Sequence, residues 1–122
     1  MKLHVSAPGA ANTFTGYGEG YVMVNGERRD SSLVVLPDRI EPWRPDAFDR
    51  LSTEDFAFLR ELNVDIVLLG TGARQRFPHP RLTRQLAQAG IGLEVMDVQA
   101  ACRTYNILVA EERKVAAALL FA

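Results

Sequence analysis

The sequence lacks most of the residues from which catalytic and metal sites are built. It has one cysteine, Cys102, and two histidines, so neither an intramolecular disulfide nor a Cys/His zinc cluster is available. It contains no Gly-Lys-Ser/Thr phosphate loop and no Ser-His-Asp order with a nucleophile elbow. We therefore predict a protein with no catalytic residues, no bound metal and no cofactor.

Long apolar runs and an excess of positive charge are also missing. No segment approaches the ~20 apolar residues that cross a bilayer, and the first residues match neither a signal peptide nor a transit peptide. The formal net charge of -1 argues against a dedicated nucleic-acid binder. We expect a soluble, cytoplasmic protein that neither inserts into a membrane nor binds nucleic acid. Its 122 residues are enough for one domain, spanning 1–122.

Acidic and basic side chains are unevenly distributed along the chain. Residues 38–65 contain eight acids and four arginines, whereas residues 66–93 contain four arginines and no acid. Two such blocks can pair within the fold or face two different partners. The sequence leaves both alternatives open.

The first third of the chain is predicted to form strands. Residues 21–24 and 32–36 have strand character, and Asn25-Gly26 is the strongest two-residue signal for a hairpin. We expect the hairpin to add antiparallel strands to the sheet. Residues 37–51, with Trp43 among three prolines, are expected to be irregular, with Trp43 covering the edge of the core.

Helices and strands are predicted to alternate from residue 52 onward. Ser52 and Asp55 form a capping box, and Pro80 and Asp97 are typical starts of two further helices that end near residues 90 and 110. Strands are expected at 65–69, 93–96 and 115–121. We therefore predict an α/β fold with one central mixed β-sheet, in which an N-terminal β-hairpin is followed by a β-α-β-α-β unit.

Two polar segments are candidates for a binding site. Gly70, Thr71 and Gly72 directly follow a buried strand, where open α/β sheets bind ligands, and Arg74 and Arg76 come next. The glycines would let backbone amides approach an anion, although a plain tight turn explains them as well. The spacing does not match a dinucleotide-binding fingerprint.

The predicted helix at 97–110 carries the second candidate segment. Arg103 and Asn106 share one face, while Tyr105 points into the core. Their hydrogen-bonding groups must be satisfied either within the protein or by a ligand. Cys102 has no histidine placed beside it by the sequence, so we predict a buried, unreactive thiol.

The run of thirteen residues at 96–108, with its Ala-Cys-Arg-Thr-Tyr-Asn core, resembles the Mth-like domain family, as do residues 65–72. Most members of this family have no known function, and it includes the mitochondrial respiratory complex I assembly factor three. The resemblance implies a three-layer α/β fold, no established activity or cofactor, and protein partners. Val98 stands where the family usually has Thr. Glu112 replaces the usual Gly, at a cost of about 1–2 kcal/mol if that residue has positive φ.

Two functions remain in contention. The leading hypothesis is a non-catalytic protein-binding or assembly module, linked to respiratory-complex biogenesis. The alternative is a domain or enzyme that binds a small molecule or anion where the turn at residues 70–72 meets the helix segment 103–106. A structural role in a homo-oligomer also stays open.

Overall fold

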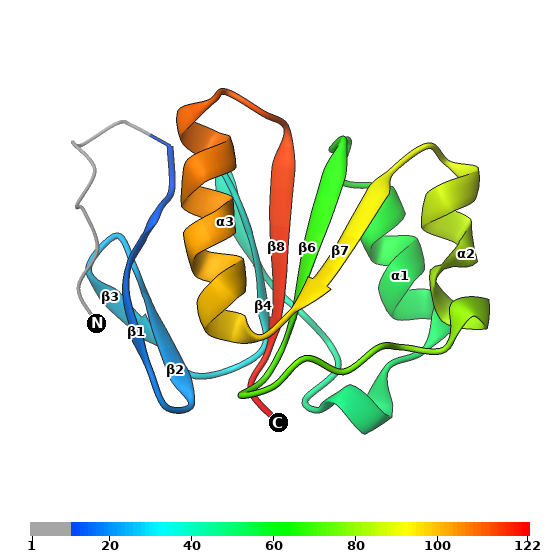
Figure 1. Cartoon of the computed structure of the whole chain (residues 1–122), viewed down its shortest axis with the longest axis horizontal. Helices are drawn as coiled ribbons and strands as arrows, with labels where there is room; N and C mark the ends of the chain where they lie inside the picture. Colours follow the sequence, from blue (N-terminus) through cyan, green and yellow to red (C-terminus); the bar gives the residue numbers. More distant parts are fainter. Residues whose placement is uncertain (1–10) are drawn as a thin grey trace.

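The computed structural model describes residues 11–122, which form two β-sheets and three α-helices (Figure 1). The strands are β1 (Phe14–Gly18), β2 (Tyr21–Val24), β3 (Glu27–Arg29), β4 (Leu33–Leu36), β5 (Arg39–Pro42), β6 (Ile66–Thr71), β7 (Gly92–Met96) and β8 (Val115–Leu120). The helices are α1 (Thr53–Arg60), α2 (Pro80–Gln88) and α3 (Val98–Ala110), and a 3-10 turn spans Phe48–Arg50.

The central sheet is mixed, as predicted. Its strand order is β5-β4-β8-β6-β7; β6 is parallel to both β7 and β8, and β4 is antiparallel to both β5 and β8. The parallel strands arise because α2 and α3 are the crossovers from β6 to β7 and from β7 to β8. Strand β8, predicted at residues 115–121, is buried along its whole length.

Three layers result because both faces of this sheet are covered. The side chains of β8 alternate between two cores, with Ala116 and Ala118 in one and Ala117 and Leu119 in the other. The first core is closed by α1 and α2, and the second by α3 together with the small sheet of β1, β2 and β3. In Figure 1 the small sheet and α2 lie at opposite ends of the molecule.

The predicted hairpin is present, but it does not join the central sheet. Asn25 and Gly26 have φ of 52° and 83°, as a type I′ turn requires, and they connect β2 to β3. These strands pair with β1 in a separate three-stranded sheet. The expectation that they supply the antiparallel strands of the central sheet is therefore wrong. The antiparallel strands of the central sheet are instead β4 and β5. Strand β5 forms the edge of the sheet beside β4.

The prediction of irregular structure from residue 37 to 51 is wrong for β5. This strand pairs with β4 in the register Val35↔Ile40. Its last residue, Pro42, lies on an edge strand, where a missing N–H removes no ladder hydrogen bond. Trp43 then turns inward: it is 5% exposed and packs edge-on against Phe56, which confirms its expected place in the core.

The start of α1 is fixed by the predicted capping box. The Asp55 carboxylate accepts hydrogen bonds from the Ser52 N–H and from the Arg44 guanidinium, at 2.8 Å each. Burial raises the pKa of Asp55, but the hydrogen bonds from Arg44 and Ser52 outweigh it and lower the pKa overall. The charged carboxylate thus stabilises the fold at neutral pH, and this contribution is lost as the pH falls through the lowered pKa.

None of the helices within residues 11–122 has the length and apolar character needed to span a bilayer.

Candidate functional site

Gly70 belongs to strand β6, whereas the sequence predicted that the strand ends at residue 69. A Cβ atom added to Gly70 would lie 2.7 Å from Cδ2 of Leu119 and 3.2 Å from Cα of Val98. A side chain at this position would therefore push α3 away from the sheet. Glycine is required here for close packing of a helix on a strand.

The hydroxyl of Thr71 is enclosed and fully engaged in hydrogen bonds. It donates to the carbonyl oxygen of Arg74 at 2.8 Å and accepts from the N–H of Arg76 at 2.9 Å. Gly72 has φ of 78°, and its carbonyl accepts a hydrogen bond from the N–H of Val98 at 2.9 Å. The turn therefore fastens the following loop and the start of α3 to the end of β6.

The two predicted arginines of this loop differ in their surroundings. Arg74 is exposed and makes no ion pair with the described residues. Arg76 pairs with Asp49 at 3.0 Å, and its guanidinium lies 4.2 Å from the centre of the Phe48 ring. The acidic and basic blocks of the sequence therefore meet at Arg76.

The polar residues of α3 are hydrogen-bonded to the strand β1 and to Asn12, which precedes it. The side-chain amide of Asn106 accepts from the N–H of Phe14 at 2.9 Å and donates to its carbonyl at 2.8 Å. The hydroxyl of Tyr105 donates to the carbonyl of Asn12 at 3.0 Å, and Arg103 Nη1 donates to the hydroxyl of Tyr17 at 3.0 Å. These bonds join segments 86 to 93 residues apart. They attach α3 to the small sheet, and a binding role for these residues stays a prediction.

Cys102 lies on the buried face of α3, as predicted. Burial raises the pKa of its thiol to about 12, so the side chain is a neutral thiol at physiological pH. Burial also raises the pKa of the Tyr105 hydroxyl. A thiolate nucleophile needs a lowered pKa and access to a substrate, and the surroundings of Cys102 provide neither.

A cavity of about 550 Å³ lies where the carboxyl ends of β6 and β8 meet the start of α3. Gly72, Val98 and Phe121 line it together with the turn between β1 and β2. This is the place where the strand order reverses, since β6 leads to β7 on one side and β7 leads back to β8 on the other. The predicted turn therefore borders a cavity, but none of the predicted arginines is among its lining residues. The charged groups that line it are Glu19 and Asp97.

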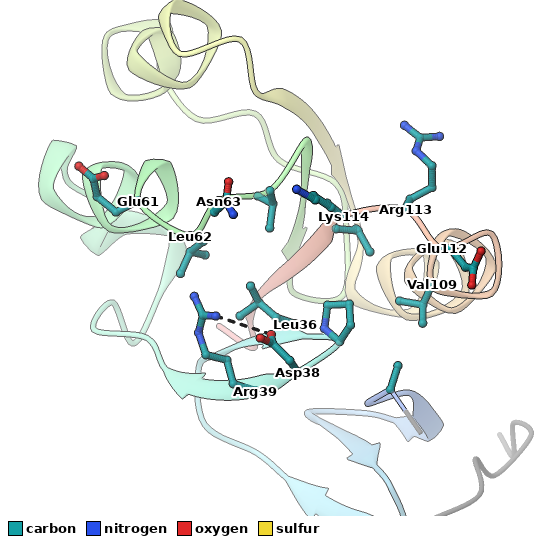
Figure 2. Close-up of a pocket in the computed structure, with 14 residues that line it drawn as sticks. Leu36, Asp38, Arg39, Glu61, Leu62, Asn63, Val109, Glu112, Arg113 and Lys114 are labelled. Atoms are coloured by element: carbon teal, nitrogen blue, oxygen red, sulfur yellow. Dashed lines mark ion pairs between the residues drawn. The ribbon is translucent and has the colours of Figure 1, made fainter. Parts of the chain in front are cut away.

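A second cavity, of about 530 Å³, lies at the opposite ends of the same strands (Figure 2). Its wall includes Leu36 and Leu62, and Figure 2 shows Lys114 and Arg39 reaching toward the space while Arg113 points away from it. Arg39 is already paired with Asp38 and Glu41. The lysine makes no ion pair with the described part of the chain.

Sequence reasoning did not find the second cavity, because its walls come from distant segments that share no motif. Two of its lining residues, Asn63 and Glu112, have left-handed backbone, with φ of 58° and 60°. The energetic cost of left-handed backbone is lower for an asparagine than for a glutamate. The conditional prediction for Glu112 is therefore confirmed: the residue has the positive φ that favours glycine.

No group of three or more His, Cys, Asp or Glu side chains within residues 11–122 is placed to hold a metal ion. His79 caps the start of α2, where its Nδ1 accepts the N–H of Arg81 at 3.0 Å. His4 lies outside the described residues.

Comparisons with known proteins place the chain among relatives of the same fold. It is 35% identical over 99 residues to the NADH dehydrogenase [ubiquinone] 1 alpha subcomplex assembly factor 3 of Danio rerio; the match covers 80% of this chain and 57% of that protein. The chain thus spans little more than half the length of the first curated relatives it matches.

Solved structures match over almost the entire chain. A crystal structure of a Bordetella parapertussis protein superposes with a TM-score of 0.88 at 37% identity, covering 95% of this chain and 100% of that one. A solution structure from Bordetella pertussis, described as a Mth938-like domain, has a TM-score of 0.82 at 33% identity, covering 98% of this chain and 92% of that one. The predicted resemblance to the Mth-like domain family is confirmed.

The model of a family described as "Protein of unknown function (DUF498/DUF598)" matches residues 14–120, from the first residue of β1 to the last of β8. With the whole fold inside the match, this chain belongs to the DUF498/DUF598 family.

Proposed function

We propose that this protein is a non-catalytic module that binds other proteins and assists their assembly. The observation that carries the proposal is the set of contacts made by α3. Its arginine and asparagine are bonded to β1, its tyrosine is bonded to Asn12 just before that strand, and its cysteine is a neutral buried thiol. The segment most like an active site therefore serves the fold.

The name of the relatives suggests which proteins the partners are. Proteins at 31–35% identity in zebrafish, cattle and human are named as assembly factors of NADH dehydrogenase. On that likeness we propose that the partners of this chain are subunits of a respiratory NADH dehydrogenase or proteins that deliver them. The relatives are longer, so the proposal concerns the part of them that this chain covers.

Affinity capture from the native cell tests the proposal. The protein carrying a C-terminal tag should recover the same partner proteins in repeated captures, and respiratory NADH dehydrogenase subunits should be among them. Removal of the gene should lower the amount of assembled enzyme on a native gel. Captures without any reproducible protein would contradict a binding module, whereas captures of other proteins would contradict only the link to NADH dehydrogenase.

A second function, binding of a small amphipathic anion, is favoured by the cavity of Figure 2. Its volume of about 530 Å³ is in the range of ligand sites, and it joins an apolar wall to the unpaired ammonium of Lys114. A medium-chain fatty acid has both parts. Decanoate should raise the melting temperature of the wild type and leave that of Lys114→Ala unchanged; an equal rise in both would rule out this use of Lys114.

A further inference from the structure

The start of α2 presents an aromatic ring to solvent. Phe77, two residues before the helix cap, is 71% exposed, whereas the other large apolar side chains with high exposure, Phe58 and Ile107, are 38% and 59% exposed. Burying a phenylalanine ring stabilises a protein because it removes apolar surface from water, so a ring left in water gives up that stabilisation. Phe77 is therefore the strongest apolar contact point that the described residues offer to another molecule.

The loop that carries Phe77 is held on both sides of the ring. On one side, Arg76 is fixed by its ion pair with Asp49 and by its stacking on Phe48. On the other side, His79 accepts the N–H of Arg81 and so ties the loop to the first turn of α2. A side chain presented by a fixed backbone binds with less loss of conformational freedom.

Two exposed cations follow Phe77 in the first two turns of α2. Arg81 and Arg84, three positions apart on one helix, share a face, are exposed, and make no ion pair within residues 11–122. The first turn of α2 contains no acid. Because the amino end of a helix is itself positive, a cation such as Arg81 in the first turn is unfavourable for the stability of the helix. No acidic side chain among residues 11–122 forms an ion pair with either arginine.

The chemistry of the surface selects an acidic protein segment over a membrane. Leu82 and Leu86, the apolar residues of α2, are buried in the core, so the helix has no apolar face left to enter a bilayer. A single aromatic ring beside two arginines is instead the composition of a protein-interface contact point, in which the ring fills a pocket and the guanidinium groups meet carboxylates.

We infer that Phe77, Arg81 and Arg84 form a docking surface for an acidic segment of a partner protein, with an apolar pocket that receives the Phe77 ring. The inference rests on the proposed protein-binding function and assigns the surface that performs it.

Site-specific photo-crosslinking in the native cell tests the docking surface. Phe77 is replaced by p-benzoylphenylalanine, which keeps an aromatic ring at the position, and the crosslinked peptide is sequenced by mass spectrometry. A matched probe replaces Ile107, which is exposed on α3. The expected result is a protein adduct at position 77 whose crosslinked segment is net acidic, with little or no adduct at position 107.

Charge reversal supplies the second arm of the experiment. Arg81→Glu with Arg84→Glu should reduce the adduct at position 77 by about tenfold or more. Arg28→Glu with Arg113→Glu changes the net charge equally at exposed positions outside α2 and should leave the adduct intact. An adduct that survives the first pair, or a crosslinked segment without net acidic charge, would overturn the inference.

The remaining outcomes distinguish failure of the proposed docking surface from failure of the proposed protein-binding function. Adducts at position 107 but not at 77 would overturn the docking surface and leave protein binding standing. No protein adduct at either position, together with empty affinity captures, would overturn both. Phosphatidylserine vesicles that sediment with the wild type but not with the Arg81→Glu, Arg84→Glu variant would assign the surface to a membrane and overturn the inference as well.

Discussion

Helices α2 and α3 both follow a strand of the central sheet and both carry arginine near their beginning, yet their polar side chains have opposite surroundings. On α3, Arg103 and Asn106 are bonded to the small sheet. On α2, Arg81 and Arg84 make no ion pair with the described residues. Residue type alone therefore does not identify a binding surface. The better criterion is a polar or apolar group that the fold itself leaves without a partner.

The difference between the two helices follows from the layers. The small sheet covers α3, whereas α2 lies at the other end of the molecule, with α1 as its neighbouring helix (Figure 1). The amphipathic pattern of α2 is satisfied by burying Leu82 and Leu86 on one side only. Its other side is free to carry side chains that a packed helix could not accommodate.

The largest effect on the free energy of unfolding is expected at an aromatic residue of α3, and the comparison is with the aromatic residue that precedes α2. Tyr105→Ala should lower the free energy of unfolding by about 3–5 kcal/mol, because it empties a fully buried site beside Phe14. Phe77→Ala should change it by no more than about 0.5 kcal/mol. Urea unfolding monitored by circular dichroism measures both. Equal losses would show that Phe77 is part of the core.

The next comparison uses two amides. Asn106→Ala removes both hydrogen bonds to the backbone of Phe14 and should cost about 1–3 kcal/mol of unfolding free energy. The control is Gln88→Ala at the exposed end of α2, which should cost at most about 0.5 kcal/mol. The same urea titration applies. If Asn106→Ala left the free energy of unfolding unchanged, its hydrogen bonds would not hold α3 to β1. The proposed contrast between α3 and α2 would then fail.

A smaller effect, this time a gain in stability, is expected just after the end of α3. Glu112→Gly removes a left-handed strain of about 1–2 kcal/mol, and the flexibility of glycine in the unfolded chain takes back about 0.5–1 kcal/mol. The variant should therefore be more stable, by up to about 1.5 kcal/mol, in thermal or urea unfolding. Glu111→Gly is the matched control, since Glu111 has φ of -89° and should lose stability. The reverse order of the two variants would contradict the assigned backbone.

The smallest effect tests the cations of α2. Arg81→Glu should raise the free energy of unfolding by about 0.3–1 kcal/mol, because an acid in the first turn complements the positive end of the helix. The gain should shrink in high salt, as exposed charges are screened. Calorimetry at two salt concentrations measures it. A loss above about 1 kcal/mol would reveal a structural partner for Arg81.

The sequence predicts elements whose signals are local. The positive φ of Asn25 and Gly26, the capping box at Ser52 and the cap at Asp97 each depend on neighbours within a few residues, and all three are present. Strand β1 was missed, since its two glycines and its bulge between Phe14 and Gly16 hide any alternation. Strand β5 was missed because proline is a strong signal against a strand unless the strand lies at an edge.

The surroundings of the candidate residues were less accessible to sequence reasoning. Whether Asn106 is satisfied within the protein depends on Phe14, 92 positions away, in a strand that the sequence did not predict. The exposure of Phe77 is a property of the folded surface, and the ion pair beside it joins Arg76 to Asp49, 27 residues away. A local signal was nevertheless present: an aromatic residue within a long stretch free of acids, just before a helix with an arginine in its first turn.

Hydrogen–deuterium exchange on the captured complex tests the contrast between α2 and α3 most directly. Binding of the partner should slow exchange in the loop before α2 and in α2 itself, while exchange in α3 and β1 stays as in the free protein. Slower exchange confined to α3 and β1, with α2 unchanged, would contradict the account.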